Sequence, residues 1–98
     1  MNQVDIVIPR DYPSTIGHFP GNPIVPGAML LSEVIGAWGQ LLGAPLTSSV
    51  FKVAKFLNPT RPGDHVTIRF EPIGADSVKF NCVVNETTVL TGSLGYSR

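Results

Sequence analysis

Apolar residues in the first half of the chain predict a short strand followed, after a loop, by one long helix. Residues 4–8 are rich in β-branched side chains, which favours a strand, and a proline closes the run. Residues 26–42 are apolar nearly all round, as is typical of a helix that its neighbours bury. Only Ser32, Glu33 and Gln40 interrupt this apolar stretch.

After Pro45 the spacing changes to the alternation of a half-buried sheet, broken by turn-forming clusters. The predicted strands cover residues 49–57, 65–72, 78–84 and 88–96. The element order is therefore β-α-β-β-β-β, which indicates the α+β class. One helix followed by an antiparallel meander implies a sheet curled around that helix, with one face left for a partner. We expect residues 1–98 to form a single domain.

The loop before the helix, residues 17–27, contains three prolines and three glycines around one histidine, His18. Proline fixes φ and glycine allows close backbone approach, so this loop presents a titratable side chain from a nearly rigid support. Pro26 is expected at the first helical position. The free N–H groups of Gly27 and Ala28 would then be available to a carbonyl oxygen or an anion. His18 is a candidate general base or acid, and the alternative is a histidine that only hydrogen-bonds its own loop.

Composition narrows the range of partners. The formal net charge is zero, which gives no support for nucleic acid or an anionic membrane surface as a partner. No apolar run approaches the roughly 18 residues of a membrane span, and no leader pattern opens the chain. A core built from 98 residues, 43% of them apolar, is small for a monomer that also holds a pocket. We therefore expect a homodimer or a higher homo-oligomer.

The single cysteine, Cys82, excludes an internal disulfide and fits a reducing cytoplasm, and we expect it to be a buried, inert thiol. His18, His65 and Cys82 lie far apart in sequence, and this spacing does not assemble a metal site. No metal, nucleotide or other cofactor is expected. Most of the large aromatic side chains should pack in the core, with one or two beside a ligand.

Two segments carry a resemblance to a known family. Residues 17–31, Gly-His-Phe-Pro-Gly-Asn-Pro-Ile-Val-Pro-Gly-Ala-Met-Leu-Leu, resemble the signature of the 3-hydroxyacyl-[acyl-carrier-protein] dehydratases of fatty acid synthesis. Residues 55–64, Lys-Phe-Leu-Asn-Pro-Thr-Arg-Pro-Gly-Asp, are similar to the second characteristic segment of that family. The resemblance implies the hot-dog fold, an antiparallel sheet wrapped around one central helix. It also implies a homodimer with active sites at the dimer interface.

The resemblance further implies roles for individual residues. His18 would remove the α-proton of a 3-hydroxyacyl thioester, while the Gly27 N–H polarises the thioester carbonyl. Phe19, Pro26 and Ala28 would complete the substrate-binding segment. The second catalytic residue of the family is a Glu or Asp from the other subunit, fourteen positions after the histidine.

Counting from His18, that position falls on Ser32. The next residue, Glu33, is turned by about 100° around the helix and is expected to point elsewhere. A serine hydroxyl can orient a group by hydrogen bonding, but it does not deliver a proton at neutral pH as a carboxylic acid does. The usual acid is therefore missing from its place.

Three functions remain open. The first is a dehydratase, or hydratase in reverse, acting on thioesters of acyl carrier protein or coenzyme A, with Ser32 or Glu33 as a compromised partner. The second is a non-catalytic subunit that binds acyl carrier protein or completes a heterodimer. The third is a hot-dog thioesterase, against which the motif argues. We favour the first as the class of enzyme.

Overall fold

A computed structural model describes residues 2–10 and 24–98 of the chain. In chain order its elements are β1 (Gln3–Val7), α1 (Gly27–Leu42), β2 (Ser48–Phe56), β3 (His65–Pro72), β4 (Ser77–Val84) and β5 (Thr87–Ser97). This order confirms the predicted β-α-β-β-β-β sequence, and the element boundaries move by a residue at most. The α+β class is therefore confirmed.

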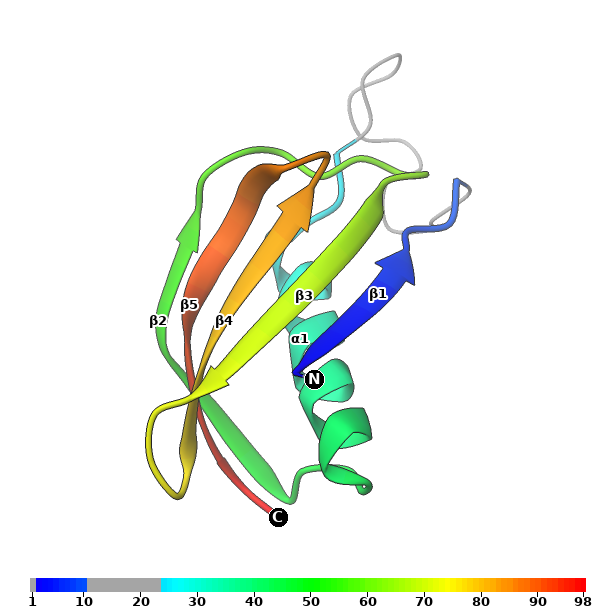
Figure 1. The fold of residues 1–98 in the computed structure, drawn as a ribbon. Coiled ribbons are helices and arrows are strands. Elements are labelled where there is room, and N and C mark those ends of the chain that lie inside the picture. Colours follow the sequence, from blue (N-terminus) through cyan, green and yellow to red (C-terminus); the bar gives the residue numbers. More distant parts are fainter. Residues whose placement is uncertain (1, 11–23) are drawn as a thin grey trace.

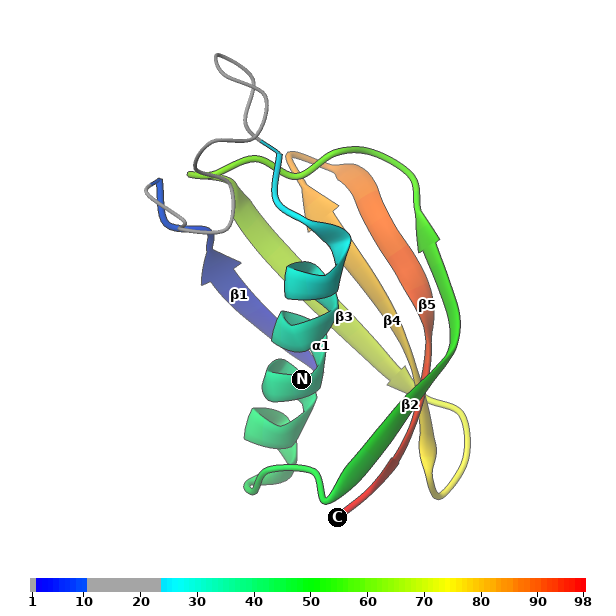
Figure 2. The ribbon, with the colours of Figure 1, turned by 180° about the vertical axis from the view of Figure 1, so that it is seen from behind.

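The strands form one antiparallel sheet in the order β1-β3-β4-β5-β2, so that β1 and β2 are its edges. The helix lies against one face of this sheet, and the β5–β2 side curves around it (Figures 1 and 2). Ile68 pairs with Cys82 and Phe70 with Phe80, which places alternate side chains of β3 and β4 on the helix side. These residues are buried, and they form the centre of the core.

Helix α1 begins after Pro26, which is its N-cap residue and not its first helical residue as the sequence predicted. The Pro26 carbonyl accepts hydrogen bonds from the Met29 and Leu30 N–H groups, at 3.0 and 3.4 Å. At the other end Gly43 takes a left-handed conformation, φ 89°, and ends the helix. The predicted stop at this glycine is confirmed.

Only one side of α1 is buried by the described part of the chain. Trp38 lies on that side, and its ring centroid is 4.9 Å from that of Phe70 and 5.7 Å from that of Tyr96. The other side carries a stripe of residues at helical spacing, Ala28, Ser32, Gly36 and Gln40, which we call the open stripe. The prediction of a helix buried all round is therefore wrong for the isolated chain, because none of the described elements covers this side.

A β-bulge bends the edge strand β2. The register shifts between Phe51 and Val53, so Lys52 has no partner on β5. The Lys52 side chain instead crosses Gly95, and its Nζ donates a hydrogen bond to Ser77 Oγ at 2.7 Å. Gly92 lies directly against the Val53 backbone, in a space that no side chain could share. Glycines on β5 therefore allow the bulged edge to approach closely.

Cys82 is buried in the core as expected. Burial raises the pKa of its thiol to about 12, so the thiolate does not form near neutral pH. Among residues 2–10 and 24–98, no helix has the length and apolarity needed to cross a bilayer.

Candidate functional site

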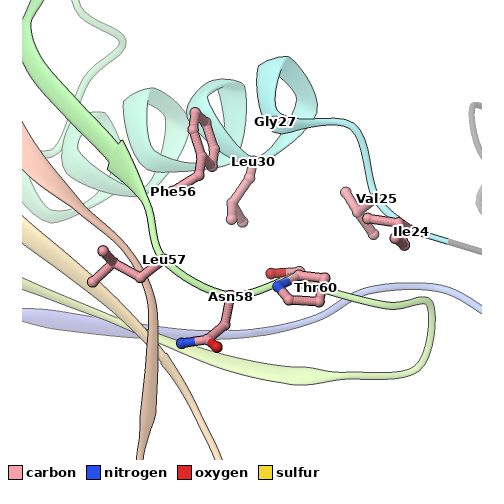
Figure 3. Close-up of a pocket in the computed structure, with 9 residues that line it drawn as sticks. Ile24, Val25, Gly27, Leu30, Phe56, Leu57, Asn58 and Thr60 are labelled. Carbon is pink, nitrogen blue, oxygen red and sulfur yellow. The ribbon is translucent and has the colours of Figure 1, made fainter.

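A pocket of about 550 Å³ opens between the start of α1 and the segment that follows β2. Val25, Gly27 and Leu30 line it from the helix side, and Phe56, Asn58 and Thr60 face them (Figure 3). Its two walls thus come from the two segments on which the family resemblance rests. The fold brings these segments together although about thirty residues separate them.

The helix wall offers backbone donors. The first N–H groups of a helix have no acceptor within it, and those of Gly27 and Ala28 are the first two of α1. The partial positive charge of the helix N-terminus adds to their attraction for an oxygen. The helix start at Gly27 agrees with the sequence to within one residue, because Pro26 is the cap. That these N–H groups bind an oxygen stays a prediction.

Phe56 lies directly on the start of the helix. A Cβ atom added to Gly27 would be 2.7 Å from Phe56 Cζ and 2.9 Å from Cε1, so only glycine fits beneath the ring as it stands. The Phe56 side chain is nevertheless 51% exposed. It therefore forms an aromatic wall of the pocket, in keeping with the expectation that one or two aromatic side chains lie beside a ligand.

The opposite wall is fixed by hydrogen bonds to two other parts of the fold. The Leu57 N–H donates to the Val89 carbonyl at 2.9 Å, and Asn58 Nδ2 donates to the Thr88 carbonyl at 2.8 Å. These two bonds tie the segment to β5. Toward the helix, the Val25 N–H donates to the Thr60 carbonyl at 2.7 Å. The spacing between the pocket walls is therefore set by backbone contacts.

The turn after Thr60 supports this wall from outside. Asp64 Oδ2 accepts a hydrogen bond from the Arg61 N–H at 2.8 Å, which closes the turn. The Gly63 N–H donates to the Ile8 carbonyl at 2.6 Å, and the Ile8 N–H donates to the Asp64 carbonyl at 2.9 Å. The second motif segment thus anchors the pocket to the end of β1.

Two buried side-chain polar atoms have no hydrogen-bond partner among residues 2–10 and 24–98: Trp38 Nε1 and Thr60 Oγ1. Trp38 belongs to the core beneath the helix, whereas Thr60 lines the pocket. Thr60 is only 4% exposed. A buried hydroxyl without a partner is unusual, because desolvation is then not compensated.

Of the site residues named from the sequence, the pocket contains Gly27, while Pro26 and Ala28 flank it without lining it. His18 and Phe19 lie outside the described residues. Ser32 belongs to the open stripe and Glu33 is half-buried, and neither lines the pocket of its own chain. Their catalytic assignment stays a prediction.

Sequence reasoning did not select Thr60 or Leu30 as pocket residues. Leu30 is one of many apolar residues in the helix, and nothing in the pattern distinguishes it. Thr60 stands in the second motif segment among turn residues, where a threonine is ordinary. Its burial becomes visible only when the contact with Val25 is known.

Residues 2–93 match the ApeI-like family, described as ApeI dehydratase. The chain belongs to this family. Several curated relatives that it matches are named 3-hydroxyacyl-[acyl-carrier-protein] dehydratase FabZ. The one from Chlamydia trachomatis serovar L2 is 40% identical over 68 residues, 60% of this chain and 44% of the relative. The one from Fusobacterium nucleatum is 35% identical over 72 residues, 68% of this chain and 49% of the relative. The chain thus spans about half the length of these relatives.

Solved structures establish the hot-dog fold. The dehydratase heterocomplex ApeI:P from Xenorhabdus doucetiae superposes with a TM-score of 0.76 at 22% identity, covering 98% of this chain and 86% of that one. An (R)-hydratase from A. caviae involved in PHA biosynthesis has a TM-score of 0.70 at 17% identity, covering 98% and 92%. The fluoroacetyl-CoA thioesterase FlK reaches 0.67 at 14% identity, covering 97% and 82%. The fold is therefore shared by dehydratases, hydratases and thioesterases, and it does not choose among these activities.

Proposed function

We propose that this chain dehydrates 3-hydroxyacyl thioesters, or hydrates the corresponding enoyl thioesters in reverse, in the cytoplasmic synthesis of fatty acids or related acyl chains. The thioester would be carried by acyl carrier protein or coenzyme A. The observation that carries the proposal is the pocket that Gly27, the first residue of α1, lines together with apolar side chains. Membership of the ApeI-like dehydratase family supports the same class of reaction.

In the proposed reaction, the Gly27 N–H binds the thioester carbonyl oxygen and stabilises the negative charge that develops there. The His18 imidazole takes the proton from C2, and the electron pair of that C–H bond forms the C2=C3 double bond. The C3–O bond breaks, and the hydroxyl group leaves as water with the proton that the His18 imidazolium returns, so that His18 ends neutral. The products are an enoyl thioester and water, and no cofactor is consumed.

The expected rate of dehydration depends on position 32, where this chain has a serine and the family has a carboxylic acid. A positioned acid or base contributes about 10²- to 10⁴-fold, and serine does not replace a carboxylic acid in protonating the leaving hydroxyl group. We therefore propose slow turnover. The position of Ser32 on the open stripe is compatible with the role that the resemblance gives this position, which is to serve the site of a second subunit.

We also propose that the chain forms a homodimer. The edge strand β2 is nine residues long, and β5 is its only neighbour among the described strands. Several large apolar side chains on and after β2 are exposed, with Val50 at 60% and Leu57 at 54%. Long exposed edges with apolar side chains are prone to pair with another chain. A second copy would cover this edge and approach the open stripe.

A second candidate function rests on the same serine. With no carboxylate at position 32, the chain would bind acyl thioesters without turning them over, or would act beside a different subunit that supplies the acid. Both forms of this function require the pocket but no acid in this chain, and only the heterodimeric form also requires His18. It differs from the first proposal in predicting no turnover by the isolated protein.

The test is the rate of water loss from a 3-hydroxyacyl thioester, on acyl carrier protein and on coenzyme A, with free thiol followed in parallel. The proteins are the wild type, His18→Ala and Ser32→Glu. Slow turnover that disappears in His18→Ala and rises in Ser32→Glu would support a dehydratase without the usual acid. The matched control is Ser97→Glu, which introduces the same charge at the exposed end of β5, away from the pocket and off the edge strand.

The other outcomes separate the alternatives. No turnover in the wild type, with activity gained in Ser32→Glu, would favour the non-catalytic or heterodimeric function. Full turnover in His18→Ala would contradict the assigned base. Release of free thiol without enoyl product would identify a thioesterase and overturn both proposals.

A further inference from the structure

Leu30 lies between the pocket and the core of the protein. Its side chain is 3% exposed and belongs to the buried core, and it also lines the pocket. In Figure 3 the labelled Leu30 side chain points from α1 toward the segment that carries Asn58 and Thr60. A side chain that contacts the core and a cavity at once forms a boundary between them. Leu30 therefore closes the pocket on its inner side.

The lining of the pocket along α1 ends at this residue. Gly27 and Leu30 line the pocket, whereas Val34, one turn further along the helix, does not. Val34 is 0% exposed and lies in the core. With the thioester carbonyl at Gly27, an acyl chain directed inward along the helix would meet Leu30 before it could reach the packed core.

We propose that Leu30 sets the longest acyl chain that the pocket accepts, so that this protein acts on thioesters of limited chain length. The inference rests on the proposed function, in which the Gly27 N–H binds the thioester carbonyl. It adds a preference among acyl chains and names the residue that determines it. Leu30 is a specificity-determining residue and takes no part in proton transfer.

Close packing explains why a leucine can act as this limit. Protein cores contain few voids, so a methylene group beyond Leu30 would have to displace core side chains, which costs free energy. Each methylene group that the pocket does bury strengthens binding by about fourfold. The affinity for a series of acyl thioesters should therefore rise with chain length and stop rising where the chain reaches Leu30.

The experiment measures dissociation constants by calorimetry for saturated acyl-coenzyme A thioesters from butanoyl to dodecanoyl, in steps of two carbon atoms. These probes carry no 3-hydroxyl group and are not dehydrated. For the wild type we expect the affinity to rise by about sixteenfold per step up to a limiting length and then to level off. Leu30→Ala should move this limit to a longer chain, by about one step. Leu30→Phe should move it to a shorter chain.

Leu30→Ala also leaves a cavity in the core, which lowers stability. Leu30→Val removes only one carbon atom and is the milder variant. It should strengthen binding of the first chain beyond the wild-type limit by about fourfold. The fluorescence of the buried Trp38 shows which variants are folded, and Leu30→Val and Leu30→Phe decide the matter if Leu30→Ala is not.

The matched control is Leu41→Ala, which removes the same atoms from the same helix. Leu41 packs against the core but does not line the pocket. This variant should keep the wild-type limit, and a limit that moves in it as far as in Leu30→Ala would overturn the inference.

Two further results would contradict the role of Leu30. Affinity that rises through the whole series in the wild type, or a limit that no Leu30 variant moves, would overturn the inference and leave the proposed function standing. Failure of the wild type to bind any of the thioesters would overturn the inference together with the proposed binding of acyl thioesters.

Discussion

Replacing Gly92 by alanine should destabilise the protein severely, because there is no space for a methyl group between β5 and β2. A Cβ atom at this position would lie 2.8 Å from Phe80 Cζ and 2.9 Å from the Val53 carbonyl carbon, and it would overlap the Val53 carbonyl oxygen. Phe80 is 1% exposed and cannot swing outward. The strain must therefore be relieved by moving the backbone of β2.

The expected loss of stability follows from the packing and the hydrogen bonds that a movement of the β2 backbone would disrupt. Overpacking a well-packed core costs about 1–3 kcal/mol, and each ladder hydrogen bond lost beside the bulge costs about 1 kcal/mol more. We expect Gly92→Ala to lower the free energy of unfolding by about 3 kcal/mol or more, a large part of the roughly 5–15 kcal/mol typical of a domain. Urea unfolding followed by the fluorescence of the buried Trp38 measures this change. A loss below about 0.5 kcal/mol, the size of an ordinary surface substitution, would refute the described approach of β2 to β5.

The same substitution at Gly36 is the matched control. Apart from the adjacent residues and the helix's own backbone, no atom of the described part of the chain lies within 4 Å of a Cβ added there, and alanine favours a helix over glycine. In an isolated chain Gly36→Ala should therefore raise the free energy of unfolding by up to about 1 kcal/mol. Light scattering on the same samples shows whether the protein is a monomer. A loss of stability in this variant, accompanied by dissociation, would indicate that a second chain packs against the open stripe.

Three further substitutions or conditions test single features. Thr60→Val should raise the free energy of unfolding by about 1 kcal/mol in urea titrations, since it removes a buried hydroxyl without a described partner, whereas Thr60→Ser should not. Asn85 and Glu86 form the β4–β5 turn with φ of 48° and 66°, so Glu86→Gly should stabilise the protein by up to about 1 kcal/mol, and a loss would contradict the turn. Burial raises the pKa of Cys82 from 9.0 to about 12, so the native state keeps a proton that the unfolded state loses, and stability should fall as pH rises from 9 toward 12. At pH 8 a thiol reagent should label Cys82 only as fast as the protein opens.

The elements of this fold were predictable because their signals are local. Alternation of apolar residues in β3 and β4, with turn residues between them, requires no knowledge of the rest of the chain. The end of α1 at Gly43 is equally local, since a left-handed residue there favours glycine. The helix start was placed one residue early, because proline is suited both to the first helical position and to the cap.

The pocket was predictable in part, for the same reason. Gly27 was found because a proline-rich loop leading into a helix marks its N-terminus in the sequence itself. Thr60 was not found, because its burial depends on the hydrogen bond between its carbonyl and the N–H of Val25, thirty-five positions earlier. The contact between Phe56 and Gly27 is likewise a product of the sheet curving around the helix. Long-range contacts of this kind have no signature in a single sequence.

The residue types of the open stripe are not explained by the structure of a single chain. A helix exposed on one side usually places charged residues there, yet the stripe consists of Ala28, Ser32, Gly36 and Gln40. Small and uncharged side chains suit close contact with another protein surface better than contact with water. Ser32, which falls where the family resemblance places the catalytic acid, lies within this stripe. Ser32 therefore bears both on which chain covers the open stripe and on which group completes the proposed reaction. The Ser32→Glu variant tests both points.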